Sequence, residues 1–267
     1  MNPEARDVFL AIARCPLVTA ALVDSSEPCA DVVAWYGTAP DGRRYFPEPW
    51  VGHLSEARIL FVASNPGAGD RGSVPGPDEV ITMASPDEEI LVSQDGAFED
   101  GQRPGIIDGT VLVDKYGENA FSVRYWVWTK RVAQELLGDT PVRPGTDYAM
   151  TEVVHCGSQH QEGTWKAAAT CASRYLDRVL GVSPARVLVV VGDVARWAFK
   201  DRLGVEVKIG ERVVADIGGY RRHLVALPHP NARGRVWGVE PYLGANGVAE
   251  VRGLLRGGGE PVPGRVQ

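Results

Sequence analysis

Arg58-Ile-Leu-Phe-Val-Ala-Ser-Asn-Pro-Gly67 joins a short apolar run to a turn. The run has β-branched and aromatic residues without polar alternation, which is typical of a strand buried on both faces of a parallel sheet. A second such run, RVLVVVG, occupies residues 186–192, and weaker runs occupy residues 150–154 and 223–228. We therefore predict four buried strands.

Helical patterns fall between these strands. Apolar residues recur at helical spacing in residues 122–137, 163–180, 194–203 and 247–255. Strands that alternate with helices predict an α/β fold. We expect a three-layer sandwich, in which helices flank a central parallel sheet of four strands.

The length of 267 residues allows one domain with a large core. Such a chain needs neither disulfides nor subunit association to fold, so we expect a monomer. We assign residues 1–256 to a single domain with an insertion at about residues 68–118, which is typical of a long loop or lid. The low-complexity tail, residues 257–267, is expected to be mobile.

Charge is distributed unevenly along the chain. The net charge of −6 argues at first against a nucleic-acid partner. However, residues 68–118 hold twelve acidic and three basic side chains, whereas residues 121–267 carry a net charge of +6. This asymmetry indicates that the C-terminal half could face a polyanion.

The sequence also bears on the cellular location. No apolar run approaches the roughly 18 residues of a membrane span. The first residues include Glu4 and Asp7, where a signal peptide has a basic segment before an apolar core. We expect a cytoplasmic protein with no membrane partner, and therefore cysteines that form no disulfides.

Two turns follow predicted strands and carry chemically useful side chains. Asn65 follows the strand at residues 58–63, and His229 follows the strand at residues 223–228. The carboxyl ends of parallel strands meet at one edge of the sheet, where ligands bind. An Asn carboxamide can hold a water molecule, and a His can donate to an oxygen on which negative charge develops. The pair suits hydrolysis of an N-glycosidic bond to a pyrimidine, although each segment alone is also an ordinary turn.

The order of ILFVASNPG, TEVVHC, ARVLVVVGDVARWAF and LPHPN resembles the uracil-DNA glycosylase superfamily over about residues 56–236, outside the insertion. Asn-Pro-Gly is similar to the first motif of the mismatch-specific and single-strand-selective branches. His-Pro-Asn is similar to the second motif, which is usually His-Pro-Ser. The resemblance implies a four-stranded parallel sheet between helices, with Asn65 activating water and His229 stabilising the departing base.

The match also implies residues of a base pocket. Phe121 stands where the family places the aromatic ring that stacks on the base, and a place in the core is the alternative. Asp70 lies near the position of an acidic residue in the iron–sulfur branches and could assist the water. Ser64, beside Asn65, completes this expected set.

The loop after His229 continues as Asn-Ala-Arg-Gly-Arg to residue 235. The resemblance implies that this loop enters the minor groove and fills the gap left by a flipped nucleotide. Arg233 is then the wedge, and an exposed Arg without a DNA contact is the alternative. The residues expected to contact DNA are Asn231, Arg233 and Arg235, with Arg221 and Arg222 along the backbone.

Glu152 departs from the family pattern. Uracil-specific members have an Asn at this position, which reads the edge of the base. A carboxylate only accepts hydrogen bonds, whereas an amide both donates and accepts. An ionised Glu152 therefore suits a base with an exocyclic amine, such as a modified cytosine, better than it suits uracil. The alternative is that Glu152 faces away from the pocket.

The four cysteines resemble those of the iron–sulfur branches in part. Cys156 and Cys171 have the family spacing and context, whereas Cys15 and Cys29 are farther apart than the family Cys-x2-Cys pair. Four thiolates suit a [4Fe–4S] cluster. Zinc is the alternative occupant of such a set, and buried free cysteines are also ordinary.

Together these features favour a monofunctional DNA glycosylase. It would hydrolyse the bond to a damaged or modified base flipped out of DNA and leave an abasic site, in repair or in defence against phage DNA. The chemistry itself needs no cofactor. A non-catalytic binder of modified or abasic DNA on the same fold is the first alternative, and a small-molecule hydrolase is the second.

Overall fold

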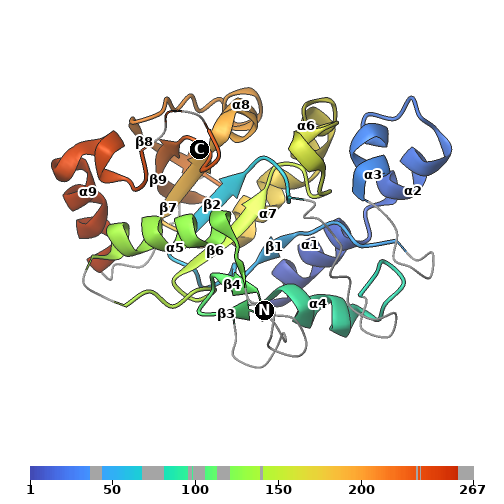
Figure 1. Ribbon diagram of the computed structural model, residues 1–267, viewed down its shortest axis with the longest axis horizontal. Coiled ribbons are helices and arrows are strands. Elements are labelled where there is room, and N and C mark those ends of the chain that lie inside the picture. Colours follow the sequence, from blue (N-terminus) through green and yellow to red (C-terminus); the bar gives the residue numbers. More distant parts are fainter. Residues whose placement is uncertain are drawn as a thin grey trace.

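The protein is built on a six-stranded mixed sheet, seen in a computed structural model (Figure 1). The structure describes residues 1–36, 44–67, 81–95, 98, 106–112, 121–138, 141–232, 234 and 236–257. In spatial order the strands are β1 (Trp50–Val51), β6 (Tyr148–Glu152), β2 (Ile59–Ala63), β7 (Val187–Val191), β9 (Tyr220–Leu227) and β8 (Arg212–Ile217).

The four predicted strands form the centre of this sheet. β6, β2, β7 and β9 are mutually parallel, and β1 and β8 are antiparallel edges. The prediction of four parallel strands alone was therefore wrong, because the sheet is mixed. β8 was not predicted because exposed and half-buried side chains alternate along most of it, and β1 was not predicted because it has only two residues.

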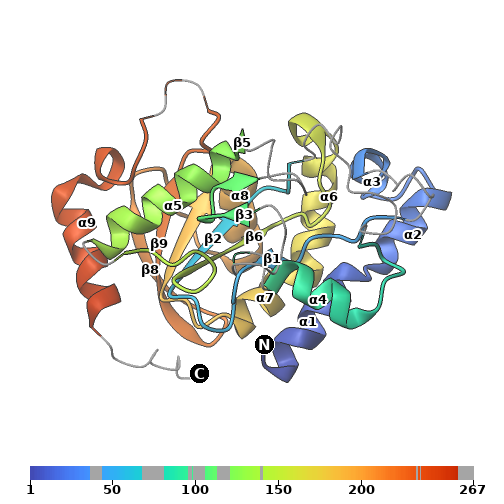
Figure 2. The same cartoon turned by 60° about the horizontal axis from the view of Figure 1, so that its bottom comes forward.

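Helices pack on both faces of the sheet. One face is covered by α5 (Arg124–Leu137) and α9 (Glu240–Arg256), whose apolar residues form one core with alternate residues of the strands. The other face carries α1 (Pro3–Ala13), α7 (Asp177–Val182) and α8 (Gly192–Leu203), whose apolar residues join a second core. Figures 1 and 2 show α5 and α9 together at one side of the sheet.

The predicted helix at residues 163–180 is divided into three parts. α6 (Thr164–Cys171) is followed by a π-helical turn at residues 172–176 and then by α7. Turns of this kind inside a helix often occur near functional groups. Here the turn directly follows Cys171 and contains Tyr175.

The N-terminal helices were not predicted. After α1, the short helices α2 (Pro16–Val23) and α3 (Ala30–Tyr36) lie at one end of the molecule, beside α6 (Figure 1). Lys166 of α6 forms an ion pair with Asp31 of α3. This arrangement brings the start of the chain to the segment around Cys171.

The described parts of residues 68–118 contain regular structure, so the prediction of one long loop was wrong there. α4 (Asp87–Asp95) packs on α1, and Arg14, the residue directly after α1, donates to the carbonyl oxygens of Met83 and Ser85. A small sheet joins β3 (Ile106–Ile107), β4 (Val111–Leu112) and β5 (Phe121–Ser122). Within the part of the chain that the structure describes, no helix combines the length and apolar character needed to span a membrane.

Candidate functional site

The carboxyl ends of the four parallel strands bring the expected residues to one edge of the sheet. Asn65 follows β2, Glu152 ends β6 and His229 follows β9. Ala63 of β2 is the register partner of Glu152. Gly192, at the end of β7, lies beside His229, since a Cβ atom built on this glycine would be 3.6 Å from the Cβ atom of His229. The topology thus assembles side chains that are far apart in sequence.

The carboxamide of Asn65 is held by the loop that follows β6. Its Nδ2 atom donates to Ser158 Oγ at 3.1 Å and to the carbonyl oxygen of Pro66 at 3.0 Å. Its Oδ1 atom accepts from the Ser64 hydroxyl at 3.3 Å. A carbonyl oxygen can accept two hydrogen bonds, so Oδ1 retains capacity to bind a water molecule.

The loop that holds Asn65 contains residues that sequence reasoning missed. Gln161 Nε2 donates to Ser64 Oγ at 3.1 Å, and Ser158 Oγ lies 3.3 Å from Thr164 Oγ1. His160 and Gln161 have φ angles of 50° and 63°, a region that residues other than glycine rarely adopt. A Ser and a Gln in a polar loop carry no local signal of this role, because it depends on contacts with a distant strand end.

His229 has its ring orientation and its tautomer set by neighbouring groups. The backbone N–H of Asn231 donates to His229 Nδ1 at 3.1 Å. Because Nδ1 accepts in this contact, the proton of a neutral imidazole lies on Nε2. His229 can therefore donate a hydrogen bond from Nε2. The side chain of Asn231, expected to contact DNA, belongs to an exposed residue.

Tyr125, in the first turn of α5, packs against His229. The two rings are stacked, with centroids 5.8 Å apart and an angle of 17° between their planes. The Tyr125 hydroxyl is buried and has no hydrogen-bond partner within the described residues. Burial, with the nearby Glu152 and Tyr148, raises the pKa of this phenol well above its ordinary value. Phe121 is the aromatic residue predicted for the pocket, and its side chain lies outside the described part of the structure.

Glu152 faces the same side of the sheet as α5. Side chains alternate along a strand, so Glu152 shares its face with Tyr148 and Met150, which belong to the core under α5. The residue is half-buried. Burial, and then the charge of Glu48, raise the pKa of the Glu152 carboxyl well above its ordinary value. Glu152 thus lies toward Tyr125 and the strand-end edge.

Other predicted residues do not join this edge or cannot be placed. Asp70, Arg233 and Arg235 lie outside the described residues. Arg221 and Arg222 begin β9, at the opposite end of the strand from His229. The prediction that Arg222 contacts DNA was wrong, because this side chain is wholly buried and its guanidinium donates to three backbone carbonyl oxygens, those of Leu180, Ser183 and Ile217.

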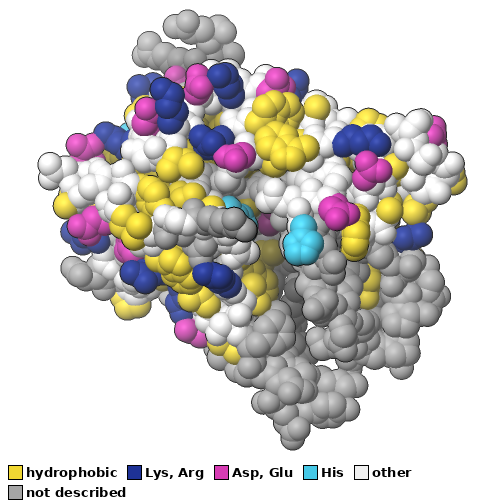
Figure 3. All heavy atoms as spheres, turned by 45° about the horizontal axis from the view of Figure 1, so that its top comes forward, with side chains coloured by type: hydrophobic (Ala, Val, Ile, Leu, Met, Phe, Trp, Pro, Cys, Tyr) yellow, Lys and Arg dark blue, Asp and Glu magenta, His cyan; other side chains and the backbone are white. Residues whose placement is uncertain are grey.

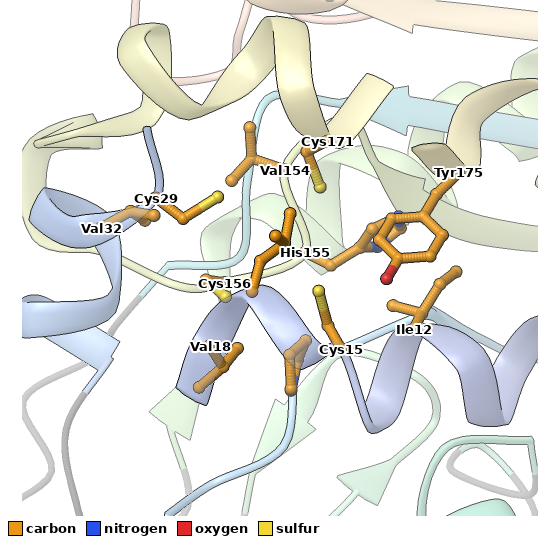
Figure 4. A pocket seen from close by; sticks show the side chains of 12 residues that line it. Ile12, Cys15, Val18, Cys29, Val32, Val154, His155, Cys156, Cys171 and Tyr175 are labelled. Carbon is orange, nitrogen blue, oxygen red and sulfur yellow. The ribbon is translucent and has the colours of Figure 1, made fainter. Parts of the chain in front are cut away.

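The four cysteines converge on one cavity (Figure 4). Cys15 precedes α2, Cys29 precedes α3, and Cys156 and Cys171 flank the loop and helix after β6. Figure 4 shows the sulfur atoms of all four turned toward the same space, with His155 beside them. Burial raises the pKa of the Cys29 thiol to about 11 and that of Cys171 to about 12. A metal would have to supply the positive charge that makes these thiolates stable.

We tested whether these residues fit a metal group. The donor set is suitable, since four buried thiols from three segments line one cavity. Among the described residues, which include every cysteine, no group of three or more His, Cys, Asp or Glu side chains is placed to hold a metal ion. The cavity measures about 20 Å³, room for about one water molecule. A four-iron cluster therefore fits the donor chemistry only if the thiols move apart.

The surface at this side of the molecule has mixed charge. Figure 3 shows Lys and Arg side chains interspersed with Asp and Glu side chains, and hydrophobic side chains gathered between α8 and α6. Trp165 of α6 and Trp197 of α8 pack edge to face, with ring centroids 6.1 Å apart, and Trp165 is 53% exposed. A DNA partner would meet scattered charges and an aromatic patch on this face.

Comparison with known proteins adds no relative. No family model matches the sequence, and no curated protein matches it. The resemblance to uracil-DNA glycosylases that the sequence motifs indicate therefore stays a prediction.

Proposed function

We propose that this protein is a monofunctional DNA glycosylase that releases a damaged or modified base and leaves an abasic site. The observation that carries the proposal is the placement of Asn65 and His229 after β2 and β9, at the same edge of the sheet and on either side of β7, each with defined hydrogen-bond partners. The amide oxygen of Asn65 has capacity for a second hydrogen bond, and a neutral His229 carries its proton on Nε2. A wholly structural turn needs neither property.

In the proposed reaction, Asn65 Oδ1 orients a water molecule toward C1′ of the flipped nucleotide. The water oxygen bonds to C1′, and the bond between C1′ and the base nitrogen breaks, so that the electron pair departs with the base. Negative charge then develops on the base oxygen O2, where a hydrogen bond from His229 Nε2 stabilises it. The water loses one proton when its oxygen bonds to C1′, and the departing base takes up one proton. The protons of the overall reaction therefore balance.

The proposal includes a resident [4Fe–4S] cluster held by Cys15, Cys29, Cys156 and Cys171, because the four thiols line one cavity, and they would have to move apart to hold it. The cluster would supply structural cross-linking of the N-terminal helices to the loop after β6. Zinc on the same thiols is the alternative occupant.

The remaining expectations belong to the same proposal. The packing of helices on both faces supports a three-layer sandwich, as in the resembled superfamily. DNA is the partner, the protein acts as a monomer in the cytoplasm, and its role is in repair or in defence against foreign DNA. The loop after His229 would contact the strand beside the flipped base.

Base release tests the proposal directly. Purified protein is incubated with oligonucleotides that carry uracil, hypoxanthine or a hypermodified cytosine, and free base and abasic sites are quantified. We expect release from at least one substrate, and a loss of at least about a hundredfold in rate for Asn65→Ala and for His229→Ala. Asn246→Ala, on the exposed part of α9, is the matched control and should retain the rate. Full activity in both site variants would refute the mechanism.

One observation favours a second candidate, a non-catalytic binder of modified or abasic DNA. Glu152 stands where uracil-specific relatives of the motif have an amide, so the pocket differs in its base-reading group. Salt-dependent DNA binding without base release from any substrate of the panel would support this candidate over the glycosylase.

A further inference from the structure

The carboxyl group of Glu152 has an unusual environment. It ends β6 on the face covered by α5, and the described residues give it no ion pair and no hydrogen bond. No Lys or Arg is among the groups that affect its charge, whereas a second carboxylate, Glu48, is. Burial of a charged carboxylate without a neighbouring cation costs free energy. The neutral, protonated form of the group avoids this cost and is therefore favoured.

Each titratable group near Glu152 either disfavours a negative charge on its carboxyl group or is itself neutral. Glu48, in the segment before β1, disfavours a second negative charge. Tyr125 of α5 and Tyr148 of β6 are neutral phenols whose pKa values are raised by burial. His229, after β9, is stacked on Tyr125 and carries its proton on Nε2 when neutral. Burial and Glu48 together hold the pKa of Glu152 well above the ordinary value of 4.5.

We propose that Glu152 is a specificity-determining residue that reads the base as a neutral carboxylic acid. This inference rests on the proposed glycosylase function. A neutral carboxyl group has one O–H donor and one carbonyl acceptor, as an amide has one donor and one acceptor on its edge. It can donate to the O4 atom of a 4-oxo pyrimidine while it accepts from N3–H.

Loss of the proton changes the preference. The carboxylate has only acceptors, so it repels O4 and favours the exocyclic amine of a 4-amino pyrimidine. Protonation of one side chain therefore selects between two edges of the base. The expectation from sequence that Glu152 excludes a uracil-type base applies only to the ionised form.

Binding at several pH values tests this inference. The probe is DNA with one uncleavable nucleotide, carrying either a 4-oxo or a 4-amino pyrimidine, and affinity is measured by fluorescence anisotropy from neutral to alkaline pH. For the wild-type protein we expect the ratio of 4-oxo to 4-amino affinity to fall as pH rises, by about tenfold per pH unit above the pKa of Glu152, because one proton is released.

Two variants identify the group. Glu152→Gln keeps a donor and an acceptor without a titratable proton, so its affinity ratio should stay constant with pH. Glu152→Asp withdraws the carboxyl by one methylene, so it should weaken 4-oxo binding but keep the pH dependence. Glu240→Gln, an exposed position at the start of α9, is the control and should behave as wild type.

The outcomes separate this inference from the proposed function. A wild-type ratio that does not change with pH, or a fall that persists in Glu152→Gln, overturns the role of Glu152. Absence of base release from every substrate, together with a pH-dependent ratio, overturns the glycosylase and leaves the role of Glu152 standing.

Discussion

The two residues at the centre of the proposed site are oriented by hydrogen bonds with loop residues around them. Asn65 is oriented by Ser64, Ser158 and Pro66, and His229 is oriented by the N–H of Asn231. The contact with Ser64 leaves Oδ1 of Asn65 able to accept a second hydrogen bond, and the contact with Asn231 places the proton of a neutral His229 on Nε2. The chemistry of the site is therefore set by which atoms the fold has already satisfied.

Asp147 shows a different use of a buried carboxylate. Its side chain is 2% exposed, and it accepts from Arg58 at 2.8 Å and from the backbone N–H of Arg143 at 2.8 Å. Burial alone would raise its pKa, but the hydrogen bonds from Arg143 and Arg58 outweigh burial and lower it. The carboxylate joins the loop before β6 to the start of β2.

Asp147→Asn should reduce the free energy of unfolding by about 2 kcal/mol at neutral pH, because hydrogen bonds to a charged group are lost. The lowered pKa means that the unfolded chain binds the proton more readily than the folded protein. The stabilisation is therefore fully present above the ordinary pKa of 3.8 and is lost as pH falls through the lower folded value. Urea unfolding at neutral and acid pH measures both effects.

Asp201→Asn, on an exposed position of α8, is the control for this comparison and should stay within about 0.5 kcal/mol of wild type. A difference between wild type and Asp147→Asn that is as large at strongly acid pH as at neutral pH would contradict the assignment to the carboxylate.

At the scale of elements, the four parallel strands, which are buried over most of their lengths, could be predicted, and the two edge strands could not. β2 and β7 are buried along their whole lengths, so their apolar runs are unbroken. β8 has one exposed face and β1 has two residues, so neither produces such a run. The segment at residues 163–180 has a helical pattern, but no local pattern marks its π-helical turn.

In the proposed site, too, residues marked by a local sequence pattern could be predicted, and residues whose roles depend on distant contacts could not. Asn65 and His229 could be chosen because each directly follows a recognisable strand, and parallel strands end at a common edge. Tyr125 and Gln161 could not, because their roles arise from contacts with residues distant in sequence. The direction of Glu152 follows from strand alternation once its register with Ala63 is known.

The approach of α6 to α3 depends on one glycine. Gly163 precedes α6 with a φ of 73°, and a Cβ atom there would lie 2.4 Å from the backbone nitrogen of Val32. Gly163→Ala must therefore separate the two helices or distort the turn. We expect this variant to lower the free energy of unfolding by at least about 1 kcal/mol more than the backbone strain of a left-handed alanine alone would.

Gly204→Ala isolates that strain. Gly204 ends α8 with a φ of 65°, and a Cβ atom there would meet no other atom within 4 Å. Chemical unfolding of both variants gives the difference. Equal losses of stability would show that the close contact between α6 and α3 contributes nothing.

At the scale of the whole molecule, net charge is a poor guide to the partner. Much of the acidic excess lies in residues 68–118, and α4, a described helix of that segment, packs on α1. Asp87 and Glu88 of α4 form ion pairs with Arg14, directly after α1, and with Arg6 of α1. These carboxylates are therefore partly neutralised, which lessens their effect on a polyanion at the site.

The cysteine cavity lies between the N-terminal helices and the segment after β6. Cys15 and Cys29 belong to the N-terminal helices, whereas Cys156 and Cys171 belong to the segment after β6. A metal group bound to all four would cross-link segments more than a hundred residues apart in sequence. Because a ligand that binds only the folded state stabilises it, metal content and unfolding should be coupled.

Protein purified without oxygen should contain about four iron atoms per chain and absorb visible light, as thiolate-bound clusters do. Removal of the metal by a chelator should lower the Tm. Cys156→Ser should lack the metal and show no further decrease in Tm on chelation, whereas Val18→Ala, which changes an apolar residue of the same cavity, should lose packing but retain the metal.

Zinc in place of iron would identify the alternative occupant. Metal-free protein with an unchanged Tm would instead show that the four thiols are ordinary buried side chains, since binding only to the folded state must stabilise it.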